Sequence, residues 1–309
     1  MFLFFLLVVL IAIYAIFSAV ISLNEHFFKN EAIPTWKELY EMSGFSSSAY
    51  SGAFGDFAVH FIDVEQGDCA LVVAGDYTIL IDSGEISQKS KVITYIRSLD
   101  IDHINMVVAS HPHSDHIGGL CDVLERYPAK EIIMPELTEE NAPTTRVYED
   151  LLEAIYDNGT TAEFIFDEAY HVNFDEDITL RIIAPVEQSD NLNDMSLICY
   201  AEAIDSGFAV LGDAEKGELS SVYDETIYDF SADVIAMGHH GSSTSVYKPF
   251  LSAVNADVAV ISCGKDNSYG HPHKEALDYI QANAMTCLRT DESGNIIFKV
   301  TEEGYSLVK

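Results

Sequence analysis

Basic residues are scarce in this chain. Its 309 residues include 16 lysines and arginines against 50 aspartates and glutamates, which gives a formal net charge of −34 at neutral pH. Nucleic-acid binding draws much of its affinity from clustered lysine and arginine, and the sequence has no such cluster. The same charge opposes attraction to anionic lipid. The composition therefore argues against a nucleic-acid-binding protein, although it also suits an exported protein that has to stay soluble.

Cysteine motifs and serine-hydrolase motifs are missing as well. The five cysteines are scattered without a CxxC pair, which argues against a zinc finger and favours buried thiols over a disulfide scaffold. A bridge between Cys263 and Cys287 outside the cell stays open. The chain has no GxSxG elbow, which argues against Ser/His/Asp covalent catalysis.

The first 22 residues carry no charged side chain. Such a run is long enough to span a bilayer, so residues 1–22 predict an uncleaved membrane anchor with its amino end in the cytoplasm. We expect a single-pass protein of the cell membrane whose acidic bulk lies outside. Cleavage after the small residues at 20–22 is the alternative and would give a secreted protein. Residues 23–56 end in a Ser/Gly-rich stretch that is typical of a linker.

From residue 57 the sequence alternates between short apolar runs and turn residues. Strands come first, and helices are then interleaved in two series. This order indicates two mixed sheets packed face to face with helices outside, a four-layer αββα sandwich of class α/β over residues 57–309. The expected strands are 57–64, 69–75, 77–84, 104–110, 131–137, 177–185, 196–204, 208–213, 233–238, 257–263, 296–300 and 305–309. The expected helices are 89–99, 115–126, 146–158, 214–224, 246–254 and 273–284.

The stretch Ser110–Gly118 reads SHPHSDHIG and holds three of the 11 histidines. Imidazole and carboxylate are the usual ligands of zinc, and this density favours metal binding over chance. His111 and His113 lie on a loop that leaves a predicted strand. Asp115 and His116 lie on the first turn of the next helix and aim elsewhere. Two ligand pairs that point to adjacent centres are typical of a two-metal hydrolase.

Two further places supply polar side chains at predicted strand ends, where loop-borne sites usually lie. Asp213 follows Gly212 at the end of one strand, and capping of the next helix is its alternative role. His239 and His240 end another strand, with a cap or loop contact as the alternative. His271 and His273 give a weaker signal: His273 would open a helix, and His271 would meet a substrate phosphate or donate a proton.

The ordered motifs of the chain resemble those of metallo-β-lactamase-fold hydrolases. They are similar in particular to the soluble hydrolase domain of ComEC-type competence proteins and to secreted phosphorylcholine esterases. The motifs are DVEQGD, ILIDSG, SHPHSDHIGGL, NDMSL, LGDAE, GHHGSSTS, NSYGHPH and RTDESG, which together run from about residue 57 to about residue 300. The resemblance implies the αββα fold, two divalent metal ions (usually zinc, sometimes manganese) and hydrolysis, often of phosphodiesters.

The resemblance also implies roles for individual residues. Asp213 would bridge the two metals, His239 would lie near the substrate, and Asp82 would support the site from beneath. The metal ligands would be His111 and His113 for the first ion, and Asp115, His116 and His240 for the second.

Two departures from the family pattern stand out. Many relatives have another first-metal histidine before the bridging aspartate, whereas here only His171 falls in that interval, in a different context. Residues 193–196 (NDMS) occupy the place, as in the ComEC-like branch, so water or substrate would take the open position on the first metal. Relatives also usually have glycine where this chain has Glu65, which puts the local turn in doubt.

The leading hypothesis is a phosphodiesterase that uses a metal-bound hydroxide, with Asp115, Asp213, His239 and His271 as catalytic residues. A small-molecule or envelope phosphodiester, such as a phosphorylcholine ester, is the expected substrate. A nucleic acid is disfavoured by the charge of the chain and by the lack of a many-helix channel. The alternative is a metal-stabilised, non-catalytic binding protein of the cell envelope. We expect a monomer.

Overall fold

The computed structural model describes residues 57–174 and 178–308. These residues belong to one compact unit. The predicted anchor at 1–22 and the linker at 23–56 lie outside the described residues. Within the described part of the chain, no helix combines the length and the apolar character that a bilayer span requires.

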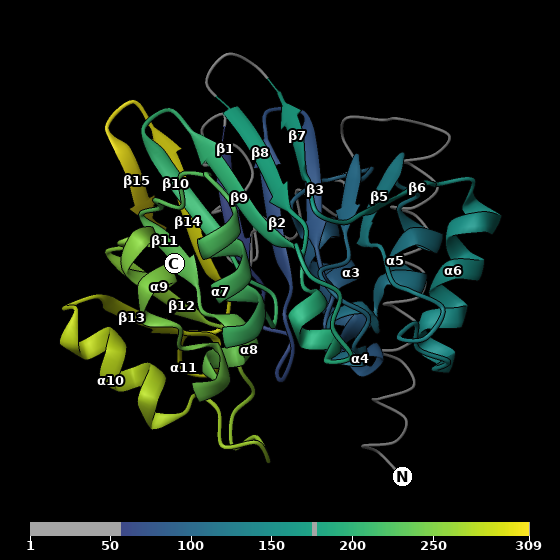
Figure 1. Ribbon diagram of the computed structural model, residues 1–309. Coiled ribbons are helices and arrows are strands. Elements are labelled where there is room, and N and C mark those ends of the chain that lie inside the picture. The colour runs from purple at the N-terminus through teal and green to yellow at the C-terminus, as the bar shows by residue number, and fades with distance from the viewer. Residues whose placement is uncertain (1–56, 175–177, 309) are drawn as a thin grey trace, which may run out of the picture. The chain divides into compact units, whose positions relative to one another are not determined.

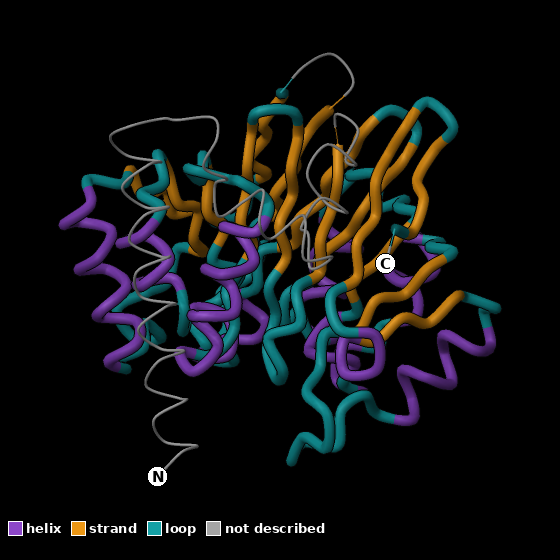
Figure 2. Tube along the Cα trace, turned by 180° about the vertical axis from the view of Figure 1, so that it is seen from behind, coloured by secondary structure: helices purple, strands orange, loops and turns teal. Residues whose placement is uncertain are grey.

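The strands form two mixed sheets (Figures 1 and 2). The eight-stranded sheet has the order β15-β14-β1-β2-β3-β4-β5-β6, and the seven-stranded sheet has the order β13-β12-β11-β10-β9-β8-β7. The first sheet comprises β1 (Phe57–Phe61), β2 (Ala70–Ala74), β3 (Tyr77–Ile81), β4 (Met106–Val108), β5 (Glu131–Pro135), β6 (Thr161–Ile165), β14 (Ile296–Thr301) and β15 (Gly304–Leu307). The second comprises β7 (Ala169–Asn173), β8 (Ile178–Ile183), β9 (Ile198–Ala203), β10 (Ser206–Val210), β11 (Val234–Ala236), β12 (Val258–Ile261) and β13 (Thr286–Arg289).

Alternation along the strands builds the layers. On β1, Phe57, Val59 and Phe61 pack into the core between the two sheets, because side chains two apart share a face. Two further apolar clusters lie on the outer faces. One cluster lies between the first sheet and the helices that cover it, which are α3 (Lys89–Ser98), α5 (Leu120–Arg126) and α6 (Arg146–Asn158). The other lies between the second sheet and its covering helices, which are α7 (Lys216–Glu225), α9 (Lys248–Val254) and α10 (Lys274–Ala282). The predicted α/β sandwich of two sheets is confirmed.

Sequence analysis did not predict three of the strands, β6, β7 and β13. All three lie at sheet edges, and their side chains are mostly exposed or half-buried. An edge strand with little burial has no clear apolar alternation, which removes the signal that revealed the central strands.

The predicted helix at 115–126 was wrong as one continuous element. It is divided into α4 (Ser114–Ile117) and α5. A Cβ atom at Gly118 would lie 2.5 Å from the backbone nitrogen of Ile86, so the chain at this break packs directly on a neighbouring segment. After the break, α5 packs against α3 and α6.

Candidate metal centre

The predicted site residues follow strands that run parallel and end on one side of the sandwich. Asp82 follows β3 and His111 comes three residues after β4, in one sheet. Asp213 comes three residues after β10, and His239 and His240 lie in α8 (Gly238–Gly241) after β11, in the other sheet. Carboxyl ends of parallel strands meet at the same sheet edge, which is why these distant segments converge. Figure 1 shows α4 and α8 at this end of the two sheets.

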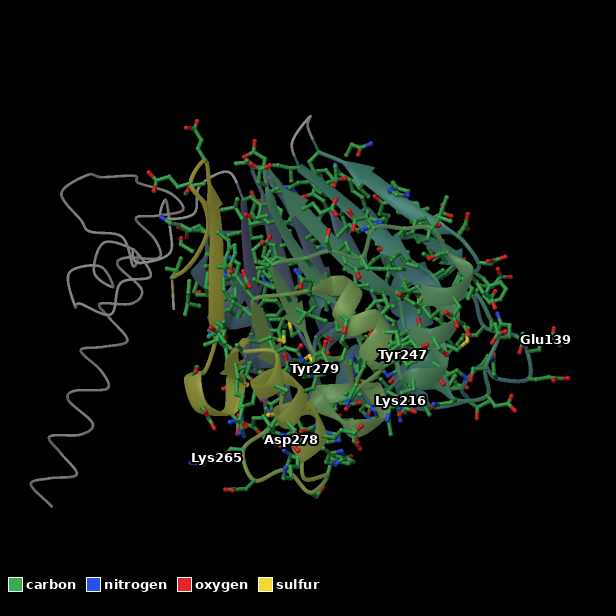
Figure 3. All side chains as sticks on the ribbon, turned by 60° about the vertical axis from the view of Figure 1, so that its left-hand side comes forward. Glu139, Lys216, Tyr247, Lys265, Asp278 and Tyr279 are labelled. Carbon is green, nitrogen blue, oxygen red and sulfur yellow. The ribbon has the colours of Figure 1, made fainter. Side chains whose placement is uncertain are left out.

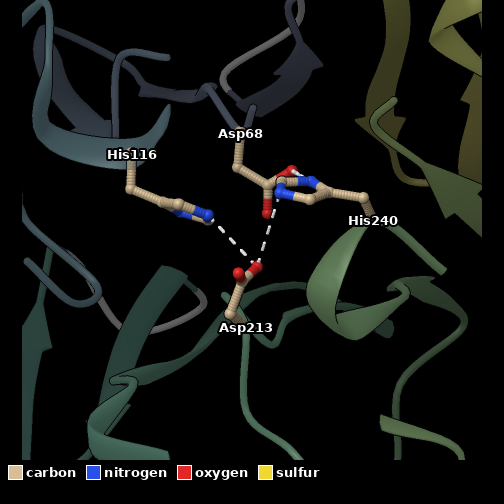
Figure 4. A group of neighbouring side chains, drawn as sticks. All are labelled: Asp68, His116, Asp213 and His240. Carbon is tan, nitrogen blue, oxygen red and sulfur yellow. Dashed lines mark ion pairs between the residues drawn. The ribbon is translucent and has the colours of Figure 1, made fainter. Parts of the chain in front are cut away.

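One cluster of side chains surrounds a common point: Asp68, His116, Asp213 and His240, whose ligand atoms all lie within 4.8 Å of one another (Figure 4). Nε2 of His116 lies 3.1 Å from Oδ1 of Asp213. Both atoms are buried and have no hydrogen-bond partner among the described residues. Buried polar atoms without partners are costly unless an ion satisfies them. The donor set of this cluster therefore fits a divalent cation.

A second cluster comprises His111, His113 and Asp213. Nε2 of His111 lies 3.0 Å from Nδ1 of His113 and 3.7 Å from Oδ2 of Asp213. Ligands of a tetrahedral zinc ion with bonds near 2.1 Å are separated by about 3.4 Å, so this spacing also fits a metal ion. Asp213 offers Oδ1 to the cluster of His116 and His240 and Oδ2 to the cluster of His111 and His113. That is the geometry of a bridging carboxylate.

Surrounding groups orient the imidazoles. Asp82 is fully buried, and its Oδ2 accepts hydrogen bonds from Nδ1 of His116 at 2.7 Å and from the hydroxyl of Ser110 at 2.6 Å. Nδ1 of His240 donates to the carbonyl of Ser262 at 3.0 Å. Each bond places the proton on Nδ1 and leaves the Nε2 lone pair directed at the centre, as in most protein metal sites.

The pKa values reflect a concentration of buried carboxylates. Burial disfavours a charged imidazole, yet Asp213 and Asp82 raise the pKa of His116 well above its usual value. Burial likewise opposes charge on His240, and Asp213 and Asp68 raise its pKa to about 10. For His111 burial prevails and lowers the pKa well below 6.5. The raised pKa values of His116 and His240 thus reflect carboxylate charge that a bound cation would balance, and such a cation would take the Nε2 lone pair in place of a proton.

Asp68 was missed by sequence analysis, although it ends the quoted motif DVEQGD. Its loop meets α4 through Gly67, whose φ of +134° is barred to other residues and whose Cβ would lie 2.3 Å from the carbonyl oxygen of Asp115. The backbone nitrogen of Asp68 donates to that same oxygen at 3.2 Å. Asp115, the predicted ligand, has its Oδ2 3.2 Å from Nε2 of His240. Asp115 and Asp68 therefore flank the imidazole of His240: Asp115 lies at Nε2, and Oδ1 of Asp68 lies 3.3 Å from Nδ1.

The remaining predicted residues form the mouth of the site. A cavity of about 490 Å³ opens over both clusters, and His239 and His271 belong to its wall. Their ring centroids are 5.4 Å apart. Burial lowers the pKa of His271 to about 4, and its buried Nδ1 has no hydrogen-bond partner among the described residues. The cavity is lined by Gln66, Pro112, His113, Ser114, Asp115, Pro143, Thr145, Val147, Leu192, Asn193, Asp213, His239, His240, Tyr269 and His271.

Several alternatives from the sequence are resolved. Asp213 does not cap a helix, because α7 begins at Lys216 with Glu215 in the N-cap position. His171 lies on edge strand β7 and belongs to neither cluster. His273 occupies the N-cap position of α10 and so opens a helix, as the sequence predicted. Glu65 has a φ of +61°, a left-handed conformation that favours glycine, the residue that the family resemblance leads us to expect there.

Comparison with known proteins agrees with this geometry. The sequence model described as "Metallo-beta-lactamase superfamily" matches residues 62–265. The chain is 27% identical over 261 residues to ComE operon protein 3 of Bacillus subtilis (strain 168), covering 78% of this chain and 33% of that protein. It is 28% identical over 253 residues to competence protein ComA of Neisseria gonorrhoeae, covering 80% of this chain and 33% of that protein. The resemblance to competence proteins is confirmed, and the chain spans about a third of the length of these curated relatives.

Among solved structures, the metallo-beta-lactamase fold protein YhfI from Bacillus subtilis aligns with a TM-score of 0.52 at 12% identity. The alignment covers 79% of this chain and 99% of that one. At this identity the likeness concerns the fold alone.

Proposed function

The chain belongs to the metallo-beta-lactamase superfamily, and from this premise we propose that it is a metal-dependent phosphodiesterase that acts on a small phosphodiester of the cell envelope. The observation that carries the proposal is the sharing of Asp213 by two ligand clusters. Its Oδ1 faces His116 and His240, its Oδ2 faces His111, and both clusters border one cavity. The expectation of a metal-stabilised binding protein is the second candidate, because a ligand set by itself does not require turnover.

When two divalent ions are bound, they supply an activated water and neutralise charge on a phosphoryl oxygen. The residues of the chain do the rest. Asp213 fixes the spacing of the two clusters from its position behind β10 and is held by a hydrogen bond from its backbone nitrogen to Ser196 Oγ at 3.0 Å. His271 presents an uncharged ring to the cavity, where it would contact a substrate oxygen. Preorganised polar groups of this kind act on charge that develops during reaction.

The cavity walls support a small substrate with one anionic group. None of the described lysines or arginines lines the cavity. Figure 3 shows Lys216 and Lys265 toward the end of the sheets that carries the site, and neither belongs to the lining. A polyanion would therefore find no cationic track beside the metal centre, in a chain of net charge −34.

Location outside the cytoplasmic membrane is part of the proposal and rests on the apolar run at residues 1–22. A nucleic acid is the alternative substrate, as the resemblance to ComEC-type competence proteins implies. Zinc is the proposed metal and manganese the alternative, since imidazole and carboxylate ligands suit both.

The test uses the full chain, loaded with zinc or manganese and assayed on bis-p-nitrophenyl phosphate, a single-stranded oligonucleotide and a lactone. We expect turnover of the small diester and its loss in His113→Ala. Preference for the oligonucleotide would favour the nuclease alternative. Bound metal with no turnover of any substrate would overturn the proposed activity in favour of the binding protein.

A further inference from the structure

Two successive histidines face different sides of the metal centre. His239 has φ and ψ of 50° and 49°, and His240 has 55° and 30°, so both adopt the left-handed conformation. Consecutive left-handed residues other than glycine are rare, because the Cβ atom crowds the backbone in this conformation. The backbone turn separates the two ring centroids by 5.9 Å with an angle of 72° between the planes. A bond from the backbone nitrogen of His239 to the carbonyl of Gly212 at 2.9 Å ties this turn to the end of β10.

The separation of the rings assigns each imidazole to a different oxygen of Asp213. Nε2 of His240 lies 3.7 Å from Oδ1, and Nε2 of His239 lies 3.6 Å from Oδ2. His111 approaches the same Oδ2 at 3.7 Å. Each of these distances is close to the separation of about 3.4 Å between ligands of a tetrahedral zinc ion. His239 therefore shares Oδ2 of Asp213 with the cluster of His111 and His113, which has three ligands where the cluster of His116 and His240 has four.

Glu215 determines which nitrogen of His239 faces the centre. Its Oε1 lies 3.0 Å from Nδ1 of His239, on the far side of the ring from Asp213. The carboxylate itself is held by the side-chain amides of Asn193 at 3.2 Å and Asn191 at 3.0 Å. A carboxylate that accepts the Nδ1 proton leaves the Nε2 lone pair free, and it raises the basicity of the ring as a ligand.

We propose that His239 is the third imidazole ligand of the first metal position and that Glu215 is its positioning residue. The inference rests on the metal centre of the proposed function and goes beyond it by giving His239 a role other than substrate contact. His239 thereby takes the part that a histidine before the bridging aspartate plays in many relatives. Sequence analysis did not assign this role to His239, because His239 lies 26 residues after Asp213 and not before it.

The first experiment measures metal binding to the full chain by competition with a chromophoric chelator, without reference to turnover. We expect two zinc ions per wild-type chain. His239→Ala should retain one ion tightly and lose the other, and Glu215→Gln should weaken the same ion by about 10–100-fold, the usual effect of removing such a carboxylate. His271→Ala is the matched control: its ring lines the same cavity next to His239. This control should keep both ions.

The second experiment detects ligation directly and does not depend on affinity. His239→Cys loaded with cobalt should show a near-ultraviolet thiolate-to-cobalt charge-transfer band, while cobalt-loaded wild type and His271→Cys should show none. Because none of the five native cysteines belongs to either ligand cluster, the wild-type background is expected to be free of such a band.

The outcomes separate the inference from the proposed function. Full retention of both ions by His239→Ala, or no charge-transfer band in His239→Cys, would overturn the inference and return His239 to the substrate. A wild-type chain that binds no metal would instead overturn the proposed function. Should His239→Ala fail to fold, Glu215→Gln and His239→Cys decide the matter, and unchanged affinity in the former together with no band in the latter contradicts the assignment.

Discussion

Nδ1 of His116 lies 2.7 Å from Oδ2 of Asp82, and neither side chain is exposed to solvent. The pair fixes the tautomer that directs Nε2 of His116 at Asp213. We predict that Asp82→Asn weakens zinc binding at the second position by about 10–100-fold, because an amide that presents its NH₂ group to Nδ1 favours the opposite tautomer. Chelator competition measures the change. Asp102→Asn serves as the control, since Asp102 pairs with the exposed His103 away from the site. Equal affinities in wild type and Asp82→Asn would show that the pair only supports the fold.

Asp68 gives a second prediction. It belongs to the cluster around His116 and His240, whereas the sequence pointed only to Asp115 and the bridging Asp213 as acidic ligands there. We predict that Asp68→Asn lowers bound zinc from two ions per chain toward one, because a charged oxygen at the second position becomes a neutral amide. Metal content after gel filtration, determined by elemental analysis, measures this. Asp115→Asn provides the comparison: if it alone releases the ion, Asp68 is not a ligand.

How much of the molecule the sequence predicts depends on burial. Central strands such as β1 and β10 carry a clear apolar pattern, because both of their faces are covered, and the sandwich followed from them. The six predicted ligands lie directly after such strands or in SHPHSDHIG, where local density of imidazoles gave the signal. Asp68 and Glu215 have no such density around them. Their roles depend on contacts between loops that follow separate strands, and a single sequence does not show which loops lie close together.

The loop that carries Asp68 supplies a third prediction, with a matched pair of glycines. Gly67 has a φ of +134° and its Cβ would lie 2.3 Å from the carbonyl oxygen of Asp115, whereas Gly75 has a φ of +58° and no atom within 4 Å of a Cβ. Gly75→Ala should therefore lower the free energy of unfolding by only about 1 kcal/mol, the cost of a left-handed alanine. Gly67→Ala should cost several times more, since backbone must also move. Urea unfolding compares the two.

Displacement of the loop that carries Gly67 and Asp68 should also change the metal content of the chain. We expect Gly67→Ala to lose zinc from the second position, because Asp68 follows directly and Asp115 lies beneath it. Gly75→Ala should retain both ions. A Gly67→Ala chain with wild-type stability and metal content would contradict the close approach of this loop to α4.

His60 leads to a prediction about acid stability that does not involve the site. The imidazole is fully buried on β1, with Nδ1 2.8 Å from the hydroxyl of Tyr95, and burial lowers its pKa from 6.5 to about 3. Between these two values the unfolded chain binds a proton that the folded chain does not, so stability falls as the pH falls. The contribution is fully present above pH 6.5. It should decline by about 1.4 kcal/mol per pH unit below that, or about 2 kcal/mol at pH 5.

His60→Gln isolates this contribution, because glutamine is able to keep a hydrogen bond to Tyr95 and does not titrate. We predict that urea unfolding with chelator present, at pH 7.5, 6.5, 5.5 and 5.0, gives a shallower decline for the variant than for wild type. Other histidines titrate in both proteins and cancel in the difference between the curves. If the two curves run parallel down to pH 5, His60 is protonated in the folded chain, and its burial among apolar side chains does not control the acid sensitivity of the fold.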